Sequence, residues 1–196
     1  MMVKDTLQGG LIYLTMALFL TAATLLRGRF RAAGRNVWFA GFVVASASVI
    51  WRGWHTGHPP MQNLFEFFLC MAAFLWPLSV LSRRQTGADT AFQDALLGLI
   101  ILFPAGFVFS EEVRRLPPAL QSPLFIPHVG SYVAGYVLLA RSALMALPLF
   151  RADAGEGVVR QADAASRQTA AVGFVLLTVG LLRGSLWGKI CCGHYW

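Results

Sequence analysis

Six apolar runs, each long enough to cross a bilayer, constrain this 196-residue chain more than any other feature. They cover residues 9–26, 36–52, 64–82, 91–109, 127–149 and 169–187. A transmembrane helix needs ~17–25 mostly apolar residues, and only 13% of this chain is charged, about half the usual share in soluble domains. Because no soluble domain fits between the runs, the sequence predicts one integral membrane domain over residues 1–196, an all-α polytopic transmembrane bundle of about six helices.

The basic residues predict how this bundle is oriented. Short cytoplasmic loops retain Lys and Arg, whereas exported loops are depleted of them. Nine arginines fall between residues 27–35, 83–84 and 151–167, and six basic residues fall in the opposite set of segments. This bias predicts an exported N-terminus, and an even number of helices then puts the C-terminus on the exported side too. Because the basic residues form short clusters between spans, nucleic acid is not an expected partner.

The predicted exported segments contain all four histidines and four of the six tryptophans: His55, His58, His128, His194, Trp51, Trp54, Trp187 and Trp196. An interfacial aromatic belt would explain any one of these residues. The presence of every histidine on one side indicates a ligand-binding role, because neutral imidazole ligates metals and haem iron. A flat aromatic surface beside it suits a planar macrocycle. The residues therefore indicate an outward-facing haem or metal site.

The exported segment 52–66 combines a Gly-Pro turn with polar side chains at a helix entrance. Asn63 is expected to cap that helix, and Glu66, three residues later, to complete a capping box. Capping leaves His58 unexplained. The run from Gly57 through His58 and Asn63 to Glu66 resembles the Gly-His-x-Pro-x-x-Asn-x-(Tyr/Phe)-Glu signature of the CcsA/ResC family, membrane proteins of System II cytochrome c assembly.

A second stretch, residues 118–132, is similar to a segment of the same family. It has an Ala-Leu-Gln-Ser turn, then His-Val and Ser-Tyr. Pro127 is expected to start a helix with His128 in its first turn, at the membrane surface. The resemblance implies that His128 is one of two external axial ligands of haem iron. Iron ligation would need a partner for the second ring nitrogen, and the sequence does not identify one.

A third stretch, residues 183–196, resembles the start of the family's tryptophan-rich WWD domain. Trp187, Gly193, Tyr195 and Trp196 fall on pattern positions. The resemblance implies that Trp187, Tyr195 and Trp196 form part of a haem platform. The chain stops before the final Trp-Asp-Pro-Lys-Glu of the pattern, which predicts the front portion of a larger haem-handling unit with an incomplete WWD segment.

The resemblance implies a function in a bacterial inner (cytoplasmic) membrane. Haem b would be moved to a site facing the periplasm and presented to apocytochrome c with a CcsB/ResB-type partner, as part of a haem lyase complex. His58, Arg52 and Glu66 are candidate haem contacts, Arg52 through a propionate. The alternative is a split or degenerate N-terminal module without independent haem activity, a structural subunit beside a second chain that carries the rest of the WWD domain. A haem-free small-solute permease would need repeats that the sequence lacks.

Arg141 and the three cysteines invite further hypotheses. Arg141 lies within a predicted span and is expected to snorkel to the inner headgroups, with a contact to a haem propionate as the alternative. Cys70 is expected to pack inside a helix. Cys191 and Cys192 are interpreted as small apolar fillers, and a thiol-relay role is the alternative.

Overall fold

The computed structural model describes residues 3–113, 115–151, 155–193 and 195, and within them the chain forms helices and no strands. Five of the six α-helices are long and apolar enough to cross a membrane, and α4, with 17 residues, is a shorter apolar helix. The prediction of an all-α bundle of about six helices is confirmed. The helices are α1 (Leu7–Arg27), α2 (Arg31–Thr56), α3 (Leu64–Thr86), α4 (Ala91–Phe107), α5 (Phe125–Met145) and α6 (Glu156–Cys192), with short 3-10 helices η1 (Pro118–Leu120) and η2 (Leu147–Phe150).

The helices differ in extent from the apolar runs that predicted them, and α5 and α6 show two reasons. The helix α5 begins at Phe125, two residues before Pro127. The first turn tolerates this proline, because the N–H groups of a first turn have no partner within the helix and the N–H that proline lacks is not required. The helix α6 begins 13 residues before the predicted run 169–187, and its polar first turns include an Asp163–Arg167 ion pair one turn apart. Apolar runs mark only the part of a helix that lipid or protein covers.

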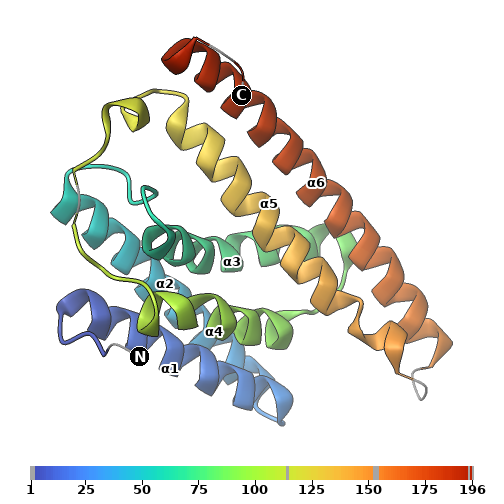
Figure 1. Ribbon diagram of the computed structural model, residues 1–196. Coiled ribbons are helices and arrows are strands. Elements are labelled where there is room, and N and C mark those ends of the chain that lie inside the picture. Colours follow the sequence, from blue (N-terminus) through green and yellow to red (C-terminus); the bar gives the residue numbers. More distant parts are fainter. Residues whose placement is uncertain (1–2, 114, 152–154, 194, 196) are drawn as a thin grey trace.

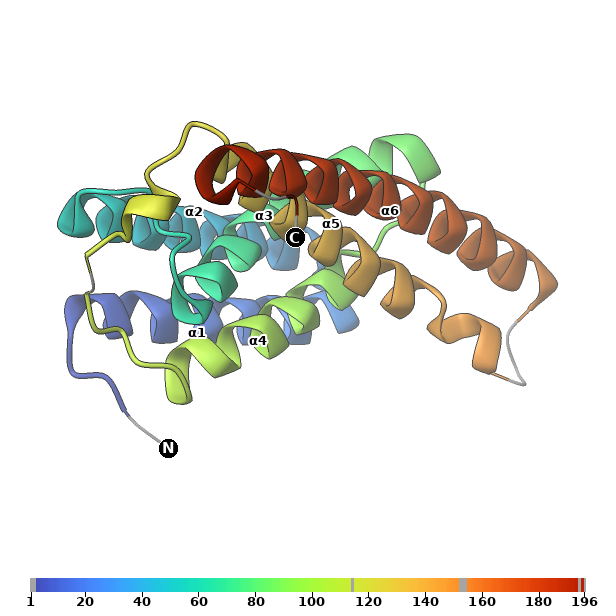
Figure 2. The same ribbon diagram turned by 45° about the horizontal axis from the view of Figure 1, so that its top comes forward.

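The six helices divide into a four-helix group, α1 to α4, and an α5–α6 hairpin that packs on it chiefly through α3 (Figures 1 and 2). The core lies where these helices meet, and its side chains are at most 1% exposed at Ile12, Phe19, Leu75, Leu102 and Val137. The ring of Phe19 fills the space beside Gly98, where an added Cβ would lie 2.4 Å from it. This fit lets α1 and α4 approach closely.

Alternating helix directions bring the start of α1, α3 and α5 and the end of α2, α4 and α6 to one end of the bundle (Figure 1). We call this the histidine end, because it carries the three histidines that the structure describes: His55, His58 and His128. At the opposite end, Arg31 and Arg35 pair with Asp89. The predicted separation of the histidines from the main arginine clusters is therefore present in the fold. The fourth histidine, His194, lies outside the described residues.

Candidate functional site

A buried ion pair joins three segments at the histidine end. Arg52 on α2 donates from Nε to Oε1 of Glu66 on α3 at 2.9 Å, and the two side chains are 4% and 1% exposed. Its Nη atoms donate to the backbone carbonyls of Glu111, at 2.7 Å, and Glu112, at 3.3 Å. Arg52 therefore ties the end of α2, the start of α3 and the segment after α4 to one another.

The loop between α2 and α3 has a defined shape. Gly57 ends α2 with a φ of 70°, a left-handed conformation that glycine adopts without strain. Asn63 caps α3, as predicted: its Oδ1 accepts the N–H of Glu66 at 2.9 Å. The predicted capping box is shifted by one residue, because Glu66 Oε2 accepts the N–H of Gln62, at 2.9 Å, instead of that of Asn63. The carboxylate thus orders the loop that carries His58.

His58 holds one ring nitrogen against its own loop and buries the other. Nδ1 lies 3.0 Å from the carbonyl oxygen of Pro59, which can only accept, so Nδ1 carries the hydrogen. Nε2 is buried and has no hydrogen-bond partner among the described residues. The side chain lines a hollow of about 730 Å³ together with Arg115, Gln121 and Phe125. The described contacts of His58 do not include His128.

His128 is the fourth residue of α5, and its imidazole lies against α6. Nδ1 is 2.7 Å from the carbonyl oxygen of Gly180. Because a carbonyl cannot donate, Nδ1 carries the hydrogen in this contact, and in the neutral ring Nε2 is then the nitrogen with the lone pair. Nε2 makes no hydrogen bond within the described part of the chain. The ring meets Tyr132 edge-on, with centroids 4.9 Å apart, and lies 5.7 Å from Trp187. The structure thus brings together His128 and Trp187, which the sequence singled out, and supplies the partner for Nδ1 that the sequence did not.

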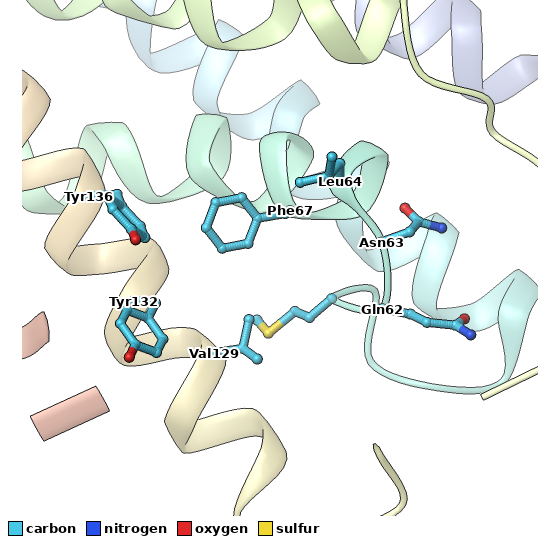
Figure 3. Close-up of a pocket in the computed structure, with 8 residues that line it drawn as sticks. Gln62, Asn63, Leu64, Phe67, Val129, Tyr132 and Tyr136 are labelled. Carbon is cyan, nitrogen blue, oxygen red and sulfur yellow. The ribbon is translucent and has the colours of Figure 1, made fainter. Parts of the chain in front are cut away.

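A second hollow, of about 420 Å³, lies between α3 and α5 one turn from His128. Figure 3 shows Tyr132 and Tyr136 of α5 bordering this space opposite Phe67 of α3. The tyrosine rings stack with centroids 6.0 Å apart, and Tyr136 meets Phe67 edge-on at 6.2 Å. Aromatic faces therefore continue from His128 along the side of α5 that borders α3.

The three predicted platform rings have different surroundings. Trp187 of α6 packs against α5, with its ring centroid 6.3 Å from that of Phe125. Tyr195 follows the end of α6 and is 53% exposed, with Lys189 Nζ 5.4 Å from its ring centroid. Trp196 lies outside the described residues. Of the three, the structure places Trp187 against His128.

The prediction that Arg141 snorkels to the headgroups is wrong. Its side chain is 0% exposed and forms an ion pair with Asp94 on α4, with Nε 2.6 Å from Oδ1. Thr90 and the carbonyl of Leu78 accept its remaining hydrogen bonds, and Ser79 donates to Asp94 at 2.5 Å. Its hydrogen bonds to the described residues all go to Asp94, Thr90 and Leu78, so its described contacts favour a structural role over a propionate contact. The missed signal was Asp94 itself, an acidic residue inside another apolar run.

The structure places two of the three cysteine thiols. Cys70 is 1% exposed, as predicted for a packed helix position, and donates from Sγ to the carbonyl of Pro60 at 3.1 Å. Cys191 is exposed near the end of α6. The side chain of Cys192 lies outside the described residues. The filler and thiol-relay interpretations of Cys191 and Cys192 therefore both stay predictions.

The donor set at the histidine end fits a metal that brings most of its own ligands. Among the described residues, no three His, Cys, Asp or Glu side chains are grouped to hold a metal ion. Haem iron is already bound by its macrocycle and takes axial ligands such as histidine from the protein. The Nε2 of a neutral His128 ring, beside Tyr132 and Trp187, would match that requirement. The fold and this corner define a class: polytopic α-helical membrane proteins with an imidazole set among aromatic rings at one end.

Comparison with known proteins gives this class a family. Residues 61–196 match the model of the family described as Cytochrome C assembly protein. The chain is 28% identical to the cytochrome c biogenesis protein CcsA of Synechococcus sp. (strain CC9902), over 79% of this chain and 63% of the relative. It is 29% identical to CcsA of Chlamydomonas reinhardtii, over 72% of this chain and 44% of that relative.

The family match begins at Met61, just before α3, and includes α3 to α6. The chain belongs to the cytochrome c assembly protein family and is an integral membrane protein. The family resemblance noted in the sequence is confirmed. The chain spans 63% of the length of the Synechococcus relative.

Proposed function

We propose that this chain binds haem b at the histidine end and holds it for covalent attachment to apocytochrome c. The observation that carries the proposal is the hydrogen bond from His128 Nδ1 to the Gly180 carbonyl at 2.7 Å, which leaves Nε2 as the unprotonated nitrogen. A neutral imidazole held in this way is a ready axial ligand for iron. Trp187, with Tyr195 and Trp196, would form the aromatic platform beside it.

In this proposal haem is the substrate, and the chain orients it. A cysteine thiol of apocytochrome c adds across a haem vinyl group: the sulfur bonds to one vinyl carbon and the thiol hydrogen ends on the other. The protein contributes a fixed iron ligand, aromatic faces that exclude water, and a defined orientation of the vinyl edges. Because both reacting groups come from the substrates, no nucleophilic side chain of the chain itself is needed.

We further propose that the histidine end faces the periplasm from a bacterial inner membrane, because the main arginine clusters lie at the other end. The partners are apocytochrome c and a CcsB/ResB-type membrane protein. A second axial ligand and the remaining aromatic platform would come from the larger unit or a second chain. The names of the relatives, cytochrome c biogenesis proteins, support this assembly role.

His58 and Arg52 take different places in the proposal. The buried Nε2 of His58 has no partner among the described residues, and the residue lines a hollow of about 730 Å³. We propose it as an additional haem contact. Arg52 directs its donors at Glu66 and two backbone carbonyls, so its described contacts favour a supporting role.

The ligand assignment predicts a spectroscopic result. The purified chain in detergent, titrated with haem b, should show a Soret band of histidine-ligated haem. His128→Gly should weaken haem binding at least tenfold, because the iron loses its protein ligand. Imidazole added to His128→Gly should restore the band position by entering the space that the side chain vacates.

His55→Ala is the matched control, because His55 lies at the same end and stacks on Trp51, away from the proposed site. It should bind haem like the unmodified chain. An unchanged Soret band and affinity in His128→Gly would refute the ligand assignment. A chain that binds no haem alone, yet supports cytochrome c assembly beside a second chain, would favour the structural-subunit alternative.

A further inference from the structure

The helices α5 and α6 approach closely along one shared face. An added Cβ on Gly173 of α6 would lie 3.2 Å from the backbone oxygen of Gly135 on α5. Ser142 and Ser166 add hydrogen bonds between the same two helices, at 3.0 to 3.1 Å. Side chains on this part of α5 therefore meet the backbone of α6 directly.

The close approach of α5 and α6 also lets His128 pack against α6 at the histidine end. Its ring occupies the space beside Gly184, where an added Cβ would lie 2.5 Å from Cε1 and 2.9 Å from Nδ1. Contacts under 3.0 Å require something to shift, and the three atoms nearest to the added Cβ all belong to the His128 ring. Side chains on a helix lean toward its N-terminus, so residue 184 is the position whose side chain would cover the carbonyl of residue 180. Because residue 184 is a glycine and lacks a side chain, the carbonyl of Gly180 stays accessible to a second hydrogen-bond donor.

We propose that Gly184 is a positioning residue: its missing side chain lets the His128 ring rest on α6 and donate Nδ1–H to the Gly180 carbonyl, which fixes Nε2 as the ligating nitrogen. Arg183 closes the arrangement by donating to the carbonyl of Pro127 at 3.3 Å and to Ser131 Oγ at 3.4 Å. The seat for the ring is formed by residues of α5 and α6. Only the identity of the group on Nε2 rests on the proposed function.

Gly157 provides an internal control on the same helix, α6. An added Cβ there would meet no heavy atom within 4 Å. Gly157→Ala and Gly184→Ala therefore make the same chemical change at two positions of α6. Only the second places a methyl group where the imidazole lies.

The test reads the tautomer of His128 in the haem-free protein. Long-range proton–nitrogen NMR of histidine-labelled protein in micelles, assigned with His128→Ala, should show His128 protonated on Nδ1 in the unmodified chain and in Gly157→Ala. Gly184→Ala should lose this signature, and its haem affinity should fall at least tenfold. Retention of the Nδ1–H signature in Gly184→Ala would overturn the proposal, whatever haem does.

A thermal-unfolding cycle covers the case in which Gly184→Ala folds poorly. If the added methyl group acts through the ring, its destabilising effect should disappear in the His128→Ala background. An equal loss of stability in both backgrounds would overturn the assignment. If the tautomer responds as expected but the unmodified chain binds no haem, the positioning role stands and the proposed function fails.

Discussion

At the scale of single residues, Arg52 shows how a candidate ligand contact can be a structural group. The side chain contacts Glu66 and two carbonyls of the segment after α4, and both members of the ion pair are buried. Removing one partner of a buried ion pair is strongly destabilising, because the remaining charge is then buried without water and without a counter-charge. Arg52 therefore acts on the site through the geometry of three segments.

This role predicts that Arg52→Met destabilises the haem-free protein by about 3–5 kcal/mol, because Glu66 is left buried without its partner. Thermal or denaturant unfolding in detergent without haem is the measurement. The double variant Arg52→Met/Glu66→Leu should recover part of the loss, since no isolated charge remains. Unchanged stability together with weaker haem binding would instead support a propionate contact.

At the scale of the elements, the Arg141–Asp94 pair fixes how α5 sits on α3 and α4. Asp94 also accepts from Thr90 at 2.8 Å, and Arg141 donates to the carbonyl of Leu78 on α3 at 3.2 Å. Ionisable groups within a membrane span pair with one another, because lipid provides no alternative partner. Since α5 carries His128 at its other end, this cluster also sets where that ring lies.

We expect Asp94→Asn to destabilise the bundle by about 3–5 kcal/mol, because the buried guanidinium loses its counter-charge. Detergent-induced unfolding followed by circular dichroism is a suitable measurement. The control is Arg167→Ala, which removes an exposed pair with Asp163 whose arginine side chain is 75% exposed. That change should cost at most about 1 kcal/mol. Equal effects of the two substitutions would contradict the assigned role of the cluster.

At the scale of the whole molecule, the candidate site and the main arginine clusters lie at opposite ends. The histidine end combines His58, His128 and the aromatic corner, whereas the other end carries the paired Arg31 and Arg35. Basic loops stay on the cytoplasmic side during insertion. The molecule is therefore expected to have a defined sidedness, with the candidate site exported.

Two glutamines exposed at opposite ends provide a test of sidedness. In a background with Cys70, Cys191 and Cys192 replaced by serine, Gln121→Cys should react with a membrane-impermeant maleimide in intact cells. Gln85→Cys should react only after the cells are opened. The reverse pattern would invert the proposed orientation and remove the candidate site from the exported side.

Some residues singled out in the sequence could be interpreted correctly from the sequence, and others could not. Asn63 was identifiable from a local signal, a cap before a helix, whereas His128 and Trp187 were identifiable from motifs that resemble those of a known family. Neither kind of signal needs knowledge of distant partners. Arg141 was misread because its partner Asp94 is 47 positions away. A charge in an apolar run has several ways to be accommodated, and only the packing of α4 against α5 selects one.

The sequence alone determined that this chain is a membrane bundle, because the lengths of its apolar runs and the placement of its basic residues are properties of single segments. It also identified the histidine that the proposed site depends on. Only the tertiary structure decided which nitrogen of His128 is protonated, since that depends on a carbonyl 52 positions away, on another helix. Hydrogen bonds between helices depend on how closely the two backbones approach each other. Whether a glycine such as Gly184 matters for that approach depends on which group of the neighbouring helix lies against it, here the His128 ring.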